Sequence, residues 1–181
     1  IWVQTNKAAQ VQIAYWPEGK PDSTYYTATK KVTKEKAYTA TLIADEVLPG
    51  KKYNYSLKID GKTYIRSYPL SFQSQTLWQH RQPAPDFKFA VGSCTYINEP
   101  QFDRPLKKPT DLPYGGGYEI FETIAQQQPD FMLWGGDNIY LREPDWGTRT
   151  GIYHRNSHAR SIPEMEKLLA TTHHYAIWDD H

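Results

Sequence analysis

Three short apolar segments in the second half of the chain constrain its fold more than any other feature. They occupy residues 87–94, 130–134 and 174–178, and stretches with helical spacing at 118–128, 151–160 and 163–170 fall between them. Their apolar character predicts buried strands, and strands that alternate with helices favour an α/β arrangement in which neighbouring strands run parallel. Ligands of such sheets bind beyond the carboxyl ends of the strands, so we expect a functional site there.

The first half of the chain has a different pattern, in which apolar and polar residues alternate. This alternation is typical of strands with one buried and one exposed face. We expect strands at 1–5, 10–16, 25–29, 37–44, 52–59 and 63–72. Turn residues separate them, and Asp60-Gly61 marks a hairpin because both positions tolerate a positive φ. The pattern predicts a β-sandwich that serves as a scaffold or docking module.

A polar segment with two prolines, 79–86, separates these halves, and we place the domain boundary near residue 84. The sequence therefore predicts a two-domain protein. Residues 1–84 form an all-β sandwich of the immunoglobulin or fibronectin kind, and residues 85–181 form an α/β domain.

Charge, hydropathy and cysteine content exclude several classes of protein. The 181 residues include 21 Lys and Arg against 20 Asp and Glu, and a net charge of +1 argues against a nucleic-acid-binding surface. No apolar run approaches the ~20 residues that span a bilayer. Cys94 is the single cysteine, which excludes an internal disulfide framework. The chain starts with an apolar alternation and no Met, so we expect that a leader or signal peptide has been removed.

Potential metal ligands follow each of the three apolar segments. Cys94 ends the first, Asp137 follows Gly135-Gly136 after the second, and Asp179-Asp180-His181 follows the third. A thiolate is a strong, soft ligand, and one carboxylate can bridge two cations. Tyr140 could also bind a trivalent ion. Two adjacent metals suit attack at phosphorus because they neutralise charge on the attacking and departing oxygens, while an imidazole can donate a proton or contact phosphate.

Each of these residues also has a purely structural interpretation. A lone cysteine after an apolar strand is often a small core residue. Gly-Asp-Asn at 136–138 forms turns readily, and Asp179-Asp180 could cap a following helix. These structural interpretations are weaker in combination, because all three would have to apply at the ends of three consecutive core strands.

Other polar residues are weaker candidates. His154 and His158 have the spacing of a zinc-binding pair on one helix face, but the neighbouring Arg155 and Arg160 favour a solvated face. Arg142 and Arg149 could contact an anionic substrate, although an exposed position is favoured for both. We expect His173-His174 to lie in a loop before the third strand.

Three ordered motifs resemble the signature blocks of the PhoD-like alkaline phosphatases, which belong to the calcineurin-like metallophosphoesterases. They are GSC at 92–94, PDFMLWGGDNIY at 129–140 and AIWDDH at 176–181. Members of this family carry a fibronectin-like module before the catalytic domain, so the resemblance covers the whole chain. It implies that residues 85–181 are the N-terminal part of a metallophosphoesterase domain, which would continue beyond His181.

The resemblance also implies a metal content and a role for each motif residue. Cys94, Asp137 and Tyr140 would bind a ferric ion, with Asp137 bridging towards calcium or another divalent metal. Asp180 would bind metal, and His181 would contact the phosphate of a small phosphate ester. Asp179 and Asn138 would support the site or bind metal themselves. Family members are secreted, periplasmic or at the cell surface, and they hydrolyse phosphomonoesters, phosphodiesters or both.

In this family the site also includes a Glu and further ligands that follow the motif found here at 176–181. The sequence ends at His181, so we expect little or no activity from the 181-residue chain alone. Two alternatives remain at this point. A purple-acid-phosphatase-like enzyme would need histidine-containing ligands after the first strand, and Cys94 argues against it. A non-catalytic extracellular binding or scaffold protein is disfavoured by the intact motif residues.

Overall fold

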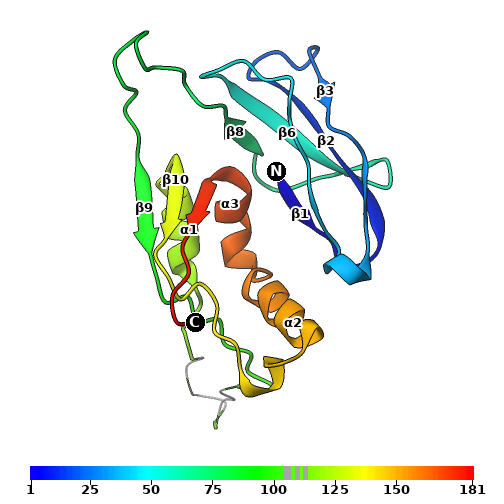
Figure 1. Ribbon diagram of the computed structural model, residues 1–181, viewed down its shortest axis with the longest axis vertical. Coiled ribbons are helices and arrows are strands. Elements are labelled where there is room, and N and C mark those ends of the chain that lie inside the picture. The colour runs from blue at the N-terminus through cyan, green and yellow to red at the C-terminus, as the bar shows by residue number, and fades with distance from the viewer. Residues whose placement is uncertain (104–106, 109–110, 112–113) are drawn as a thin grey trace. The chain divides into compact units, whose positions relative to one another are not determined.

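The computed structural model describes residues 1–103, 107–108, 111 and 114–181. The chain forms two compact units, Ile1–Asp86 and Phe87–His181, and each has its own hydrophobic core. Figure 1 shows strands only in the first unit, apart from one short 3-10 helix, and strands with helices in the second. Among the described residues, no helix combines the length and apolar character that crossing a membrane requires.

The first unit consists of antiparallel strands in two sheets. Strands β1 (Trp2–Gln4) and β5 (Thr39–Thr41) form a pair. The larger sheet has the order β3-β2-β6-β7, with β4 also paired to β2 and β8 to β6. Its strands are β2 (Ala9–Pro17), β3 (Tyr25–Tyr26), β4 (Lys30–Val32), β6 (Lys52–Ile59), β7 (Lys62–Tyr64) and β8 (Ser71–Gln73), and the 3-10 helix η1 (Lys34–Lys36) follows β4.

Alternation in β2 places its apolar side chains in the core of this unit. Val11, Ile13 and Tyr15 are fully buried, and Tyr53 of β6 packs beside Tyr15. The predicted hairpin at Asp60-Gly61 is confirmed, since β6 and β7 pair across these two residues and both have positive φ. Two expectations were wrong in detail. The predicted strand at 63–72 is split between β7 and β8, and β4 was missed because its two lysines conceal the apolar pattern. The immunoglobulin or fibronectin topology stays a prediction.

The second unit has a parallel sheet of three strands with the order β11-β10-β9. The strands are β9 (Phe89–Gly92), β10 (Phe131–Trp134) and β11 (His173–Ala176). The helices are α1 (Glu119–Gln126), α2 (Arg149–Ala159) and α3 (Pro163–Thr171), with the 3-10 helix η2 (Glu143–Asp145) before α2. The predicted parallel α/β arrangement is confirmed, and so is each predicted helix, with ends that differ by at most two residues.

This sheet buries one face and exposes the other. Met132 and Trp134 of β10 pack in the core with Phe121 of α1 and Leu168 of α3. On the opposite face the prediction of buried strands was wrong, because Phe89, Val91 and Tyr175 are 49%, 64% and 61% exposed. Ring contacts link Phe87, Phe89, Phe131 and Tyr175 into an aromatic face, which we call the open face of the sheet.

The histidine pair 173–174 lies within β11, so the loop expected for this pair was wrong, whereas the strand expected from residue 174 onward is confirmed as far as Ala176. The indole N–H of Trp134 donates to His174 Nδ1 (3.1 Å), and His174 Nε2 lies 3.2 Å from the carbonyl oxygen of Leu168. These contacts suit a neutral imidazole with its proton on Nε2. Burial, above all, lowers the pKa of His174 from its ordinary value of 6.5.

We therefore expect acid to destabilise the second unit through His174. The unfolded chain takes up the proton at a higher pH than the folded chain, so stability is lost as the pH falls below the unfolded pKa, at up to about 1.4 kcal/mol per pH unit. Urea unfolding between about pH 7 and about pH 5 measures this slope. His174→Gln should flatten it, whereas the same change at the exposed His80 should not. Equal slopes in the two variants would contradict this role.

Candidate metal centre

The carboxyl ends of the three parallel strands lie in register at one edge of the sheet. Gly92, Trp134 and Ala176 are direct neighbours across β9, β10 and β11. Backbone hydrogen bonds continue past the strands, from Cys94 N to Gly136 O (3.2 Å) and from Ile177 N to Trp134 O (3.1 Å). The loops that carry the predicted ligands are thus joined to one another, at the edge where ligands of parallel sheets bind.

Cys94, Asp137 and Tyr140 meet at the first two strand ends. The Cys94 sulfur lies 3.7 Å from Asp137 Oδ2, and the Tyr140 hydroxyl donates to the same oxygen at 2.9 Å. Cys94 and Asp137 both have left-handed backbone conformations, with φ of 60° and 49°. Non-glycine residues adopt this conformation uncommonly, and it is frequent at functional sites. The turns that follow the strands direct both side chains to one point.

Asp137 also belongs to a group of three carboxylates. Ligand oxygens of Asp137, Asp179 and Asp180 all lie within 4.8 Å of one another. Gly136 makes room for this approach, because a Cβ atom there would lie 2.5 Å from Asp179 Oδ2. The His181 ring lies 4.7 Å from the Tyr140 ring, between centroids. Six residues predicted from the sequence are thus brought together: Cys94, Asp137, Tyr140, Asp179, Asp180 and His181.

Asn138 connects two of the strand ends. Its side-chain amide donates to the carbonyl oxygen of Ile177 (2.8 Å), which fixes the loop after β10 to the loop after β11. The two roles predicted for Asn138, to support the site or to bind metal itself, both stay predictions.

The donor atoms present fit a metal ion. Asp137 Oδ1 is buried and has no hydrogen-bond partner among the residues that the structure describes. Three neighbouring carboxylates repel one another unless a cation or protons neutralise them. A thiol and a phenol suit a transition metal, and carboxylate oxygens suit calcium. The interaction with Cys94, partial burial and the hydrogen bond to Asp137 raise the pKa of Tyr140, and an adjacent cation would oppose that shift.

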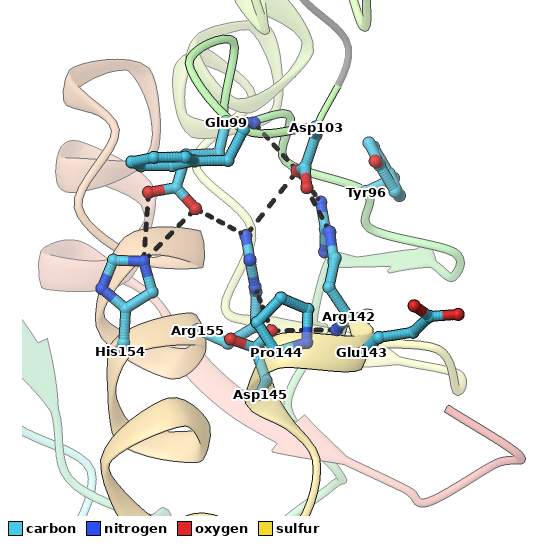
Figure 2. A pocket seen from close by; sticks show the side chains of 10 residues that line it. Tyr96, Glu99, Asp103, Arg142, Glu143, Pro144, Asp145, His154 and Arg155 are labelled. Carbon is cyan, nitrogen blue, oxygen red and sulfur yellow. Dashed lines mark hydrogen bonds and ion pairs between the residues drawn. The ribbon is translucent and has the colours of Figure 1, made fainter.

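A buried network of charges beside this centre was missed by the sequence analysis. Arg155 lies on α2 and is only 4% exposed, although the sequence favoured a solvated helix face. Arg142 pairs with Asp103 at 2.6 Å, and the side chains are 15% and 6% exposed, so the expectation of a surface charge there was also wrong. Figure 2 shows these groups in the wall of a pocket, with Glu99, Asp145 and His154.

The alternative zinc pair on α2 is not supported. His154 Nε2 contacts the carboxylate of Glu99 at 3.0 Å, and His158 Nε2 lies 3.1 Å from the carbonyl oxygen of Asn98. Within the described part of the chain, the group of three possible metal ligands is that of Asp137, Asp179 and Asp180. The sequence signal for the charge network was weak, because two of its three acidic members, Glu99 and Asp103, lie far from α2 in the sequence.

Comparisons with known proteins show a similarity of the fold. No family model and no curated protein matches the sequence. Solved structures do match, and they include calcineurin-like phosphoesterases. A purple acid phosphatase, PPD1 from seeds of yellow lupin (Lupinus luteus), aligns with a TM-score of 0.58 and 14% identity over 96% of this chain and 31% of its own. The fold of this chain therefore resembles part of the fold of the calcineurin-like phosphoesterases.

Within this class, PhoD aligns better than the lupin enzyme. Its TM-score is 0.71, with 17% identity over 99% of this chain and 36% of the PhoD chain. The resemblance to PhoD seen in the sequence motifs is thus confirmed for the fold. The chain spans about a third of the length of these two proteins.

Proposed function

We propose that this chain carries the metal centre of a PhoD-type phosphoesterase, which hydrolyses phosphomonoesters, phosphodiesters or both. The observation that supports this proposal is the convergence of one thiol, one phenol, three carboxylates and one imidazole at the carboxyl edge of the parallel sheet. Structural interpretations of the single residues do not account for this convergence. The similarity of the fold to two phosphatases supports the same class of enzyme.

We assign the metal ligands by their chemistry. Cys94 and Tyr140 would hold a ferric ion together with one oxygen of Asp137, because thiolate and phenolate are strong ligands for that ion. The buried Oδ1 of Asp137 would reach a second cation, for which Asp180 supplies a carboxylate. Calcium or another divalent metal suits this oxygen-rich side. Asp179, adjacent to Asp180, would add a further oxygen ligand or orient the carboxylate of Asp180.

The protein's own groups would divide the reaction between them. Bound cations would supply Lewis acidity towards the phosphate ester. Asp137 would help to hold the bound cations through its carboxylate oxygens. His181 would donate a hydrogen bond to a phosphoryl oxygen or a proton to the leaving group, and its ring lies against that of Tyr140. Asn138 would keep the two loops together.

The PhoD type is favoured over the purple-acid-phosphatase type by the ligands after β9. Cys94 follows this strand, and no histidine stands with it in the segment 92–98. We also propose an exported location, as the family resemblance implies. The chain spans 36% of PhoD. The substrate, the location and the phosphoesterase activity of the whole enzyme are therefore proposed here as well.

Metal titration of the chain tests the proposal. Wild-type protein should bind ferric iron with a visible tyrosinate-to-iron absorption band and should bind calcium as well. Asp137→Asn removes the shared carboxylate and should weaken iron binding by at least about 100-fold, since a lost ligand should exceed the 10–100-fold effects of its supporting groups. Asp111→Asn changes an exposed carboxylate of the same unit and should leave binding unchanged.

Phosphate binding then tests the assignment to phosphoester chemistry. Metal-loaded protein should bind inorganic phosphate, and metal-free protein should bind it far more weakly. His181→Ala should reduce phosphate binding while it retains the iron absorption band. A wild-type chain that binds neither iron nor calcium, or that binds metal without phosphate, would contradict the proposed function and favour a non-catalytic binding protein.

A further inference from the structure

We propose that Arg142 is a positioning residue for Tyr140, and that the buried charges of η2 and α2 hold Arg142 in place for this purpose. The network does not include any of the six converging residues, and its two arginines were expected to be exposed. Its connection to the metal centre runs through the backbone and the ring of Tyr140. The inference rests on the proposed function only in so far as Tyr140 is a metal ligand.

The guanidinium of Arg142 joins the loop after β9 to the loop after β10. Its Nε and Nη2 donate to Asp103 Oδ2 at 3.0 and 2.6 Å, and Nη2 also donates to the carbonyl oxygen of Ile97 at 3.0 Å. Nη1 donates to the carbonyl oxygen of Tyr140. A planar guanidinium with several fixed donors suits such a multiple contact better than an ammonium group does. One side chain therefore fixes the backbone of Tyr140 relative to the chain that follows Cys94.

A second contact path runs through aromatic rings. The Arg142 guanidinium lies 4.3 Å from the centroid of the Tyr96 ring, and the rings of Tyr96 and Tyr140 are 5.5 Å apart. In Figure 2 the Tyr96 ring lies beside the end of the Arg142 side chain. Cation–π contacts of this kind favour a defined stacking geometry. Arg142 thus limits the movement of both the Tyr140 backbone and the Tyr140 ring.

The remaining charges keep Arg142 from moving. Asp145 Oδ2 accepts from the backbone N–H of Arg142 (2.9 Å) and from Nε of Arg155 (2.8 Å). Arg155 Nη1 lies 3.1 Å from Glu99 and 3.7 Å from Asp103, the carboxylate that holds the Arg142 side chain. Figure 2 shows Asp103 between the two guanidinium groups. These charges are buried, so water screens them little and their geometry is well defined.

The arrangement goes beyond what stability requires. Apolar side chains of similar volume stabilise a core about as well as a buried ion pair does. Here the donors of Arg142 end on the carbonyls of Ile97 and Tyr140, which follow the ends of β9 and β10. The Tyr140 hydroxyl contacts Asp137 at 2.9 Å, so a shift of the loop would move this phenol away from the shared carboxylate. Arg142 therefore sets the distance between the Tyr140 hydroxyl and Asp137.

Side-chain NMR of the metal-free chain, with labelled tyrosine, tests this inference directly. The Tyr140 ring signals are assigned by their loss in Tyr140→Phe. Arg142→Met should shift or broaden them, and Arg142→Lys, which keeps the charge but loses the planar donors, should have an intermediate effect. Tyr96→Leu leaves the buried ion pairs intact and should move the same signals, which covers the case in which Arg142→Met does not fold. Arg66→Met removes a comparable stack, 4.8 Å from the Tyr64 ring, and should leave the Tyr140 signals unchanged.

Ferric iron titration adds a second measurement. The Arg142→Met and Tyr96→Leu variants should bind iron at least about 10-fold more weakly, as expected for groups that orient a ligand. Wild-type Tyr140 signals in both folded variants would overturn the inference. If wild-type protein binds no iron while the Tyr140 signals still move in these variants, the proposed metal centre fails and the positioning by Arg142 stands.

Discussion

Replacing Arg155 by methionine should destabilise the second unit by about 3–5 kcal/mol, the range for breaking a buried ion pair from one side. The change removes a guanidinium that is 4% exposed and leaves Asp145 and Glu99 buried without it. Methionine fills much of the same volume, so the loss would come from the uncompensated carboxylates and less from a cavity. Urea unfolding followed by circular dichroism measures the change in free energy of unfolding.

A second arginine on the same helix provides the control for this measurement. Arg149 is exposed and stacks on Tyr153, with 5.1 Å between its guanidinium and the ring centroid. Arg149→Met should alter the free energy of unfolding by less than about 1 kcal/mol, as for other exposed contacts. If the free energy of unfolding fell equally little in both variants, the charges around Arg155 would contribute no more to stability than a surface ion pair.

Gly136→Ala should have the second large effect, because it combines backbone strain with a direct clash. Gly136 has a φ of +113°, which side chains strongly disfavour, and its Cβ would lie 2.5 Å from Asp179 Oδ2. We expect a loss of about 1–3 kcal/mol in the free energy of unfolding from strain alone. The clash would also displace the Asp179 carboxylate from Asp137 and Asp180. Calcium binding should weaken at least about 10-fold, which calorimetric titration measures.

Gly116→Ala separates strain from the clash. Gly116 also has a positive φ, +67°, but an added Cβ there would meet no atom within 4 Å. This variant should lose stability and keep the affinity for calcium. Equal calcium affinities in the Gly136 and Gly116 variants would show that the approach of Asp179 to Gly136 has no part in metal binding.

The sequence predicted the parallel sheet and its edge because these depend on strong local signals. Apolar runs of strand length, each followed by small or acidic residues, gave β9, β10 and β11 and brought Cys94, Asp137 and Asp180 to one edge. The rule that ligands bind beyond the carboxyl ends of parallel strands then places the candidate site at this edge. In the structure the sulfur of Cys94 contacts Asp137, and the carboxylates of Asp137 and Asp180 lie together.

The charge network could not be predicted because its information is not local. Helix α2 has few apolar residues, so its pattern does not identify the side that is buried. Arg155 is buried because Glu99, Asp103 and Asp145 surround it, and two of these residues precede it by more than 50 positions. The burial of the sheet was overestimated for a related reason. An apolar strand indicates what can be buried, and the packing of neighbouring elements decides which face is covered.

The open face of the β9–β10–β11 sheet has a practical consequence for all these experiments. Its rings and aliphatic side chains, with Phe89 49% and Val91 64% exposed, offer folded protein a surface on which fluorescent hydrophobic dyes adsorb. Thermal-shift assays that detect such dyes would then start from a bright baseline and understate differences between variants. Label-free detection, by backbone ellipticity or heat capacity, avoids that background.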